Sequence, residues 1–383
     1  MKFAHIADCH IGGWKDLELK GLGMKSFERS IDICIQENVG FVLIAGDLFN
    51  TSLPSIDLIK ETAEILNKLK ERDIDVYIIP GSHDFSPSGK TMIDVLEHAG
   101  LMINVMKIKD NQLLFTEDKT GVKITGLVGL RSSLDNYYYE TLDFSNLDVP
   151  GFKIFMLHNT INEIKPKDLD KVEGMGINLL PKGFDYYAAG HVHYIKESPY
   201  GNGTLVYPGP LFPNNFKELE ELKHGGFYIY DNGNLKYFEV KLKDTLCVSI
   251  NAEGKSSKEV EDEVLRITDY EDKILLLRVA GVLREGKGSD INFKVINEKF
   301  SSAFVFLKNT TKLTSKEFLN LEVKDIEIED VEKEIVKEFD IEYSEEFVNN
   351  LMELLDKEKN EGEKNADFER RLLRDLEVVM NAN

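Results

Sequence analysis

Hydrophobic positions in the first half of the chain alternate between short apolar runs and longer stretches of helical spacing. Phe41–Ala45 is an uninterrupted apolar run, and residues 55–70 then carry apolar side chains every three or four positions. The short runs predict buried strands, and the longer spacing predicts an amphipathic helix. Strand, helix and strand in this order are typical of right-handed crossovers in a largely parallel sheet. Residues 121–160 and 184–240 are rich in strands and turns, which predicts a second sheet packed on the first.

The pattern changes at about residue 243. Residues 244–318 mix strands and helices and contain none of the histidines that could bind a metal. We therefore expect residues 1–243 to form the main α/β domain and residues 244–318 to form a small α+β accessory domain. The expected accessory elements are strands at 246–250, 274–279 and 303–308, and helices at 257–268 and 290–299.

The last part of the chain is highly charged and poor in apolar residues. Residues 319–343 are therefore expected to be a linker. Residues 344–383 carry two helical apolar stripes separated by a polar segment, which predicts a helical hairpin. Two short helices have little apolar surface to bury against each other. We expect the hairpin to dock on a partner helix, and the alternative is that it packs back on its own domain.

Composition limits the class of protein. At 383 residues the chain is long enough for two or three domains, and its hydrophobic content of 42% is ordinary for a globular protein. No apolar run reaches the roughly 18 residues that a membrane span needs, and the carboxylate of Asp8 comes too early for a signal peptide. The three cysteines form no CxxC pair, which favours a reducing, cytoplasmic compartment. The net charge of −21 argues against nucleic-acid binding, but more than half of it lies beyond residue 321.

Residues that can bind metals follow five of the expected strands directly. In open α/β sheets, ligands bind beyond the carboxyl ends of the strands, so these side chains are expected to meet. They are Asp8 and His10 after 2–7, Asp47 after Phe41–Ala45, Ser82, His83 and Asp84 after 76–80, His158 and Asn159 after 153–157, and His191 and His193 after 185–189.

This set of side chains predicts a two-metal hydrolytic site. Carboxylates beside imidazoles suit Mn²⁺, Fe²⁺ or Zn²⁺ better than Ca²⁺. Asp47 can bridge two cations, and two cations about 3.5–4 Å apart can stabilise an in-line displacement at phosphorus. His83 is then free to hold the phosphate or to protonate the leaving oxygen. Each motif alone is more often structural than metal-binding, and it is their occurrence together, each at a strand end, that favours the metal site.

The motifs resemble those of a known superfamily. Asp8-x-His10, Gly46-Asp47, Gly81-Ser82-His83-Asp84, His158-Asn159 and Gly190-His191-x-His193 together are similar to the calcineurin-like metallophosphoesterases. Within that superfamily, Ile6-Ala7-Asp8-x-His10-Ile11-Gly12, Gly46-Asp47-Leu48-Phe49-Asn50 and Tyr207-Pro208-Gly209 resemble the meiotic-recombination-eleven (SbcD-like) nucleases of double-strand-break repair. The similarity is strong over residues 1–215, weaker in the accessory domain, and only architectural at the C-terminus.

The resemblance implies a fold and a ligand set. The fold is an α/β/β/α four-layer sandwich with a small α+β capping domain and a C-terminal helical hairpin. Two Mn²⁺ per chain are implied, with Fe, Zn or Mg as possible replacements, and His83 is the implied catalytic acid. One ion is assigned to Asp8, His10, Asp47 and His193, and the other to Asp47, Ser82, His158 and His191. Asn50, Asn159 and Arg131 are candidates for substrate contacts, although an exposed arginine is more often ordinary solvated charge.

The resemblance also implies an activity and partners. Such enzymes are Mn²⁺-dependent 3′–5′ exonucleases and single-strand endonucleases that work on DNA as homodimers. In this chain the dimer contact corresponds to the helices at 55–70 and 91–98. The C-terminal hairpin corresponds to the segment that docks on a Rad-fifty-type, SMC-like ATPase. We therefore expect a cytoplasmic, nucleoid-associated DNA-repair nuclease without membrane contact.

One departure from the family pattern keeps alternatives open. The family usually has asparagine where this chain has Ser82, and a hydroxyl is a shorter and poorer metal ligand. The chain is therefore either a nuclease, a catalytically attenuated DNA-bridging scaffold of the ATPase complex, or a small-substrate metallophosphoesterase. The absence of an arginine directly after Asp47 disfavours the phosphatase version of the last alternative, since Leu48-Phe49-Asn50 follows instead.

Overall fold

The computed structural model describes residues 1–86, 91–130, 134–169 and 172–316, together with single positions further on. The chain divides into two compact units, Met1–Thr314 and Ser315–Asn383. Arg131, the expected linker at 319–343 and most of the expected hairpin at 344–383 lie outside the described residues. The described positions of the hairpin are all helical: Leu354, Phe368, Arg371, Leu372, Arg374 and Leu376.

The first sheet has six strands in the order β14-β13-β1-β2-β3-β4. Strands β1 to β4 run parallel to one another, whereas β13 runs antiparallel to β1 and β14 antiparallel to β13. The hydrophobic pattern predicts residues 184–240 in the second sheet, which is wrong for β13 and β14. Phe227 and Ile229 of β13 pack with the helices that cover the first sheet, so this hairpin gains its core there. The bounds are β1 Lys2–Ile6, β2 Phe41–Ala45, β3 Asp75–Ile79, β4 Ile103–Asn104, β13 Gly225–Asp231 and β14 Asn234–Val240.

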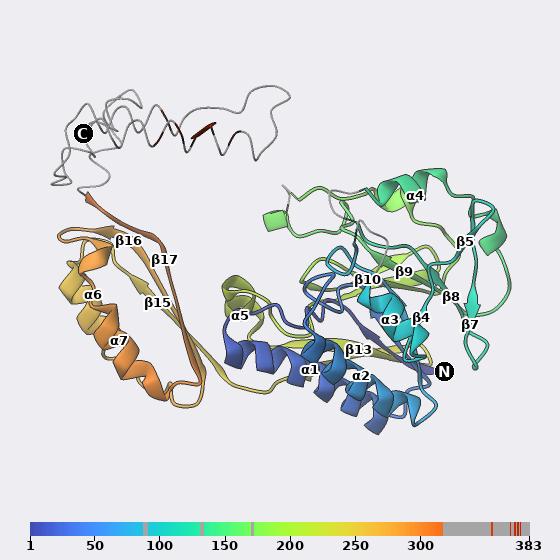
Figure 1. Cartoon of the computed structure of the whole chain (residues 1–383), viewed down its shortest axis with the longest axis horizontal. Helices are drawn as coiled ribbons and strands as arrows, with labels where there is room; N and C mark the ends of the chain where they lie inside the picture. The colour runs from blue at the N-terminus through green and yellow to red at the C-terminus, as the bar shows by residue number, and fades with distance from the viewer. Residues whose placement is uncertain are drawn as a thin grey trace. The chain divides into compact units, whose positions relative to one another are not determined.

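Three helices, α1 (Leu17–Gln36), α2 (Ile56–Lys70) and α3 (Met92–His98), accompany the first sheet, and α1 and α2 lie along its outer face (Figure 1). The expected helices at 55–70 and 91–98 are confirmed, with Ser55 and Thr91 as their N-caps. The longest helix, α1, begins after Asp16, whose carboxylate accepts hydrogen bonds from two first-turn backbone amides. Such a cap satisfies amides that have no partner within the helix.

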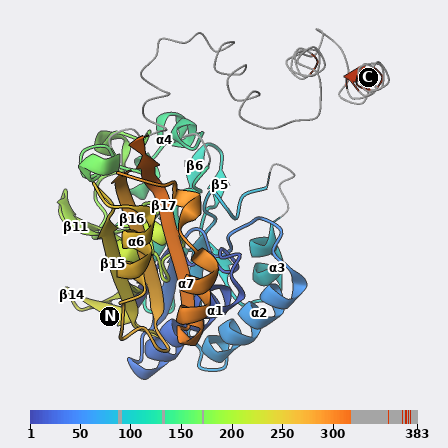
Figure 2. The same ribbon diagram turned by 90° about the vertical axis from the view of Figure 1, so that its left-hand side faces the viewer.

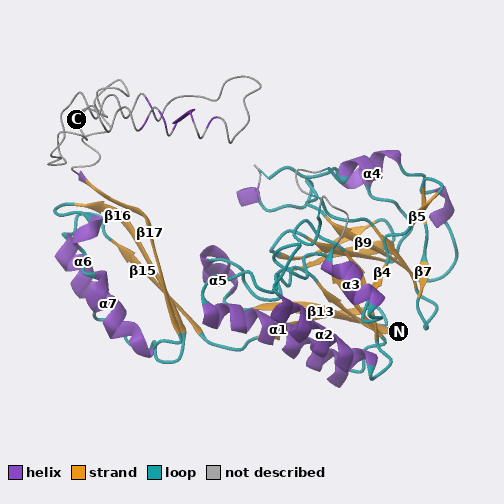
Figure 3. Ribbon diagram, in the orientation of Figure 1, coloured by secondary structure: helices purple, strands orange, loops and turns teal. Residues whose placement is uncertain are grey.

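The second sheet also has six strands, in the order β11-β12-β10-β9-β8-β7. Between the two sheets lies a core of large side chains such as Phe3, Tyr77 and Tyr186. The opposite face of the second sheet is covered by α4 (Asn136–Thr141) and by single-turn 3₁₀ helices. Figure 3 shows the resulting helix–sheet–sheet–helix layers, which confirm the four-layer α/β/β/α fold class. The bounds are β7 Thr116–Glu117, β8 Lys123–Gly126, β9 Lys153–His158, β10 Tyr186–Gly190, β11 Ile195–Tyr200 and β12 Gly203–Pro208, with a separate hairpin of β5 Ile108–Lys109 and β6 Gln112–Leu113.

A third sheet, β15-β16-β17, follows in the sequence (Figure 2). Helices α6 (Ser257–Val264) and α7 (Phe293–Lys299) pack on one of its faces. The expected helix at 257–268 ends four residues early, since the chain turns soon afterwards into a left-handed conformation at Asp269 (φ 62°). The expected strand at 303–308 extends further, to Ser315. The bounds are β15 Thr245–Asn251, β16 Ile274–Leu283 and β17 Val305–Ser315.

The other face of the third sheet contacts the rest of the unit through apolar side chains. Ile274 and Leu276 of β16 share a buried cluster with Leu19 of α1 and with Leu219 of α5 (Phe216–Leu222). The third sheet is therefore packed directly on α1 and α5. Within the described part of the chain, no helix has both the length and the apolar character that a membrane crossing requires.

Candidate metal centre

The five expected strand ends meet at one edge of the stacked sheets. Strands β1, β2 and β3 of the first sheet and β9 and β10 of the second end beside one another, and their polar residues follow at once. Three overlapping groups of side chains there have ligand atoms within 4.8 Å of one another. The groups are Asp8, His10 and His193; Asp8, Asp47 and His158; and His10, Asp47 and His83.

Asp47 lies at the centre of the cluster. Its Oδ2 is 3.2 Å from Nε2 of His158 and 3.6 Å from Nε2 of His10. Its Oδ1 accepts a hydrogen bond of 2.8 Å from the backbone N–H of His83. On the other side, Oδ1 of Asp8 lies 3.9 Å from Nε2 of His193, whose Nε2 is 3.0 Å from that of His10. The carboxylate of Asp47 thus faces candidate ligands from both sheets, His10 from the first and His158 from the second.

The backbone at these strand ends takes up unusual conformations. Asp8, His10, Asp47 and His191 all have positive φ, between 42° and 92°. Non-glycine residues rarely adopt this region, and such strain is found mainly at functional sites. Gly46 is needed for close approach, because a Cβ there would lie 2.2 Å from Nδ1 of His158. The glycine before Asp47 therefore lets two strands bring their ligands together.

Hydrogen bonds fix which ring nitrogens are free to bind a cation. Nδ1 of His158 lies 2.8 Å from the carbonyl of Ala45, and Nδ1 of His193 lies 2.9 Å from a carboxylate oxygen of Glu218. Because both partners only accept, each Nδ1 carries a proton, so in the neutral ring the lone pair is on Nε2. Nε2 of His158 faces Asp47 and Nε2 of His193 faces Asp8. Each neutral ring thus places two acceptors opposite each other, and a proton or a cation between them is needed to satisfy both. Buried His158 Nε2 has no hydrogen-bond donor in the described structure. A divalent cation satisfies such a donor set.

The electrostatics of the cluster also favour bound positive charge. Burial raises the pKa of Asp8 to about 6, against the opposing effect of the nearby histidines. Burial alone lowers the pKa of His158, but the carboxylates of Asp47 and Asp8 outweigh it and raise the value to about 10. Burial lowers the pKa of His10 to about 3, which keeps that ring neutral and able to act as a ligand.

The remaining predicted residues lie around this cluster. His191 is outside the three groups: its ring centroid is 5.1 Å from that of His158, and its backbone N–H donates to Asp8 over 2.9 Å. Ser82 is buried next to His83. The carbonyl of Asn50 accepts from Nδ1 of His83 over 2.8 Å. The amide of Asn159 donates to the side chains of Asp135 and Asn136.

Two carboxylates of the site, Asp84 and Glu218, have no role that the sequence motifs predict. Asp84 is buried and accepts hydrogen bonds from the backbone N–H groups of Leu48, Phe49 and Gly81. It therefore ties the loop after β2 to the loop after β3. Glu218 comes from α5, 25 positions after the last histidine of the motifs, and its one sequence signal is its place three residues after the N-cap Asn215.

We expect Asp84→Ala to lower the free energy of unfolding by roughly 3 kcal/mol, because three buried N–H groups lose their acceptor. The measurement is urea unfolding in the presence of a chelator, so that metal binding does not contribute. Asp84→Asn keeps one acceptor oxygen and should lose less. Equal stability of Asp84→Ala and the unmodified chain would show that the loops are held by other contacts.

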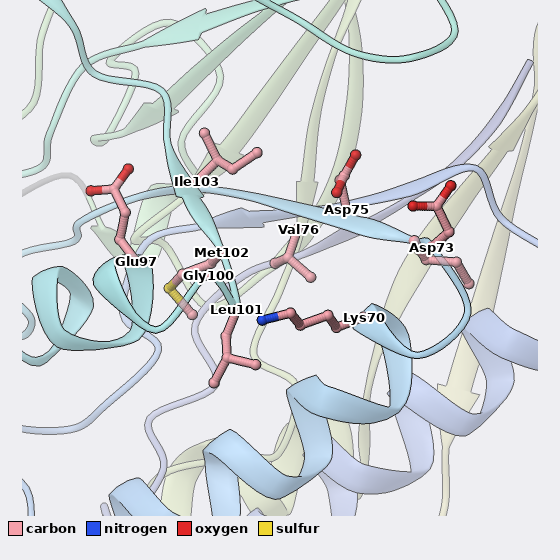
Figure 4. Close-up of a pocket in the computed structure, with 10 residues that line it drawn as sticks. Lys70, Asp73, Asp75, Val76, Glu97, Gly100, Leu101, Met102 and Ile103 are labelled. Atoms are coloured by element: carbon pink, nitrogen blue, oxygen red, sulfur yellow. The ribbon is translucent and has the colours of Figure 1, made fainter.

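A cavity of about 430 Å³ lies elsewhere in the first sheet (Figure 4). It opens at the amino end of β3, where Lys70, Asp75 and Glu97 are among its lining residues. The candidate ligands follow the opposite, carboxyl ends of β3 and of the other strands that meet at the metal centre. None of them lines this cavity, so it is separate from the metal centre.

The fold and the converging ligands define a metal-dependent phosphoesterase. Residues 1–194 match the family model of the calcineurin-like phosphoesterases, and the chain belongs to this family. The family binds divalent metal ions, and the three ligand groups supply side chains that fit them. The chain is accordingly an enzyme of the metal-dependent phosphoesterase class.

Several curated relatives carry the description "DNA double-strand break repair protein Mre11". The protein of Archaeoglobus fulgidus is 28% identical over 71% of this chain and 66% of its own length. Those of Methanococcus maripaludis and Methanocaldococcus jannaschii are each 29% identical, over 68% and 67% of this chain and 71% of their own lengths. The match to the first of these relatives thus spans slightly less than two thirds of that protein. Among solved structures, a dimetal phosphatase from Danio rerio is similar with a TM-score of 0.41 and 11% identity, covering 63% of this chain and 96% of that one.

Proposed function

We propose that the chain is a Mn²⁺-dependent DNA nuclease that processes DNA ends in double-strand-break repair. The observation that carries the proposal is the convergence of Asp8, His10, Asp47, His158 and His193 at one sheet edge. The names of the archaeal relatives support DNA repair as the setting. The proposed activities are 3′–5′ exonuclease and single-strand endonuclease, acting at the nucleoid of the cytoplasm.

The proposed chemistry is an in-line displacement at a phosphodiester. Two divalent cations, when bound by these residues, would stabilise the charge that develops on the phosphate oxygens. We assign one cation to Asp8, His10, Asp47 and His193, and the other to Asp47, Ser82, His158 and His191. The cluster geometry supports the first set most directly, since each of its four residues belongs to one of the ligand groups, whereas His191 belongs to none of them.

His83 is proposed to deliver the proton to the leaving oxygen. Its Nδ1 donates to the carbonyl of Asn50, so Nε2 is the atom that gains and releases the second proton. The ring lies against that of His10, with centroids 4.8 Å apart. His83 is therefore close enough to the proposed ligands to meet a phosphate that they hold. Asn50, Asn159 and Arg131 are proposed to contact the substrate.

The domain organisation is part of the same proposal. Residues 1–243 would form the nuclease domain and 244–318 the domain that caps DNA. Residues 319–343 would form a linker, and 344–383 would dock on a Rad-fifty-type ATPase. A homodimer is proposed through α2 and α3. Exposed apolar side chains on or near these two helices, Leu53, Ile56, Phe85 and Val95, support a protein contact there.

The purified chain is expected to cleave end-labelled duplex DNA and circular single-stranded DNA when Mn²⁺ is added, and to turn over a simple aryl phosphate monoester much more slowly. The measurement is initial rate against Mn²⁺ concentration for each substrate. A clear preference for the aryl phosphate would instead identify a small-substrate phosphoesterase.

The substitution Ser82→Asn tests whether the serine weakens the native metal site. A sharp gain in cleavage with unchanged DNA binding would indicate that serine attenuates the native site.

A further inference from the structure

Helix α5 places a carboxylate directly behind one proposed metal ligand. Oε1 of Glu218 accepts a hydrogen bond of 2.9 Å from Nδ1 of His193, and Oε2 accepts one of 2.8 Å from the backbone N–H of Asn214. The Glu218 side chain is only 15% exposed, so water competes little for these bonds. Both carboxylate oxygens are therefore engaged, and the ring of His193 has a fixed partner.

This contact sets the orientation of the His193 ring. With the proton on Nδ1, the lone pair is on Nε2, which faces Asp8 and His10. A carboxylate behind a ligating histidine fixes its tautomer and increases its basicity, and the loss of such a partner typically weakens metal binding. Glu218 is in the position that such a partner occupies.

The other side of α5 is held by the third sheet. Glu220 forms a two-pronged ion pair with Arg278 of β16, with Nε–Oε1 and Nη2–Oε2 distances of 2.8 and 2.6 Å. The guanidinium of Arg278 also lies 5.2 Å from the ring centroid of Phe216. Leu219 packs in the apolar cluster that includes Ile274 and Leu276 of β16. Helix α5 thus touches the third sheet with three of its seven residues.

The segment before α5 leads to the other histidine of the site. The side-chain amide of Asn214 donates to Oδ1 of Asn50 over 3.2 Å, and the carbonyl of Asn50 accepts from Nδ1 of His83. Trp14 donates to the carbonyl of Pro213 over 2.8 Å and fixes the start of the segment. One short stretch of chain therefore supports His193 and His83 together.

We propose that Glu218 is a positioning residue for the metal ligand His193, and that the third sheet holds Glu218 in place through the Glu220–Arg278 pair. The proposal rests on the role of His193 as a ligand proposed above. It gives the accessory domain a direct structural link to the metal centre, in addition to any contact that this domain makes with DNA.

The test is the Mn²⁺ affinity of the full chain, measured by calorimetry without substrate. We expect Glu218→Ala to weaken Mn²⁺ binding about 10- to 100-fold. Glu218→Gln should lose less, because its amide oxygen can still accept from Nδ1 of His193. Arg278→Gln should also weaken Mn²⁺ binding, but by a smaller factor. The electron paramagnetic resonance spectrum of bound Mn²⁺ should change in Glu218→Ala as the His193 ring is released.

A matched variant separates positioning from the general effect of altering α5. Glu221→Ala removes a half-exposed carboxylate of the same helix that pairs with Lys217, and it leaves Glu218 and its partners in place. This variant should retain the Mn²⁺ affinity of the unmodified chain. An equal loss in Glu221→Ala and Glu218→Ala would overturn the proposal in favour of a structural role. An unchanged affinity in Arg278→Gln would overturn the link to the third sheet.

His193→Ala distinguishes failure of this inference from failure of the proposed site. If His193→Ala weakens Mn²⁺ binding and Glu218→Ala does not, the positioning role is wrong and the ligand set stands. If neither variant changes the affinity, His193 is not a ligand and the proposed site itself is wrong.

Discussion

Asp47→Asn is expected to remove tight Mn²⁺ binding and to lower DNA cleavage by about 10³-fold, a loss of several kcal/mol of transition-state stabilisation. Oδ2 of Asp47 faces the Nε2 atoms of His10 and His158 together, at 3.6 and 3.2 Å. An amide has no charge with which to hold two cations. It would also present an N–H group to the lone pair of His158 Nε2, which replaces cation binding with an ordinary hydrogen bond.

The same substitution should leave the metal-free fold intact. The amide oxygen of the substituted side chain can still accept from the backbone N–H of His83, as Oδ1 of Asp47 does. The substitution does remove the attraction between Asp47 and His158 that raises the pKa of His158 in the metal-free chain. The thermal midpoint in chelator is therefore expected to fall only slightly, while tight Mn²⁺ binding is lost. The matched control is Asp148→Asn, which neutralises an exposed carboxylate and should change neither quantity. Tight Mn²⁺ binding by Asp47→Asn would show that Asp47 is not the shared ligand.

The sequence was most informative where the fold repeats a simple rule. Parallel strands end at the same edge of a sheet, so the residues after β1, β2 and β3 could be expected to meet from the order of strands and helices alone. For two histidines two residues apart, as in His191-x-His193, the sequence does not show which ring lies among the other candidate ligands. The structure brings the His193 ring into a ligand group and leaves His191 beside it. The two rings have different partners: Nδ1 of His193 is held by Glu218, whereas the ring of His191 lies against that of His158.

Contacts made late in the chain were beyond the reach of local patterns. The hairpin β13–β14 follows strands of the second sheet in sequence but completes the first, because its apolar face matches the layer under α1. Glu218 likewise lies 25 positions after His193, on a short helix whose sequence resembles any exposed helix. A local pattern identifies residues that can form a site, whereas tertiary packing determines which outside residues support it.

His83→Ala is expected to lower DNA cleavage by about 10²- to 10⁴-fold while Mn²⁺ and DNA binding remain close to those of the unmodified chain. The ring belongs to one ligand group, but Asp47 and His10 of that group are shared with the other two. Its removal therefore leaves most donors for the cations in place. The matched control is His98→Ala. His98 is exposed on α3, and its Nδ1 also contacts a backbone carbonyl, that of Asp94, at 2.7 Å.

The identity of the leaving group tests what His83 does. The sugar oxygen that leaves from DNA is strongly basic and needs a proton, whereas a nitrophenolate leaves without one. If His83 protonates the leaving oxygen through Nε2, His83→Ala should impair DNA cleavage far more than hydrolysis of bis(nitrophenyl) phosphate under the same Mn²⁺ conditions. Equal losses on the two phosphodiesters would exclude the role of leaving-group acid. They would instead assign His83 to holding the phosphate against the cations, a role that its position beside Asp47 and His10 also permits.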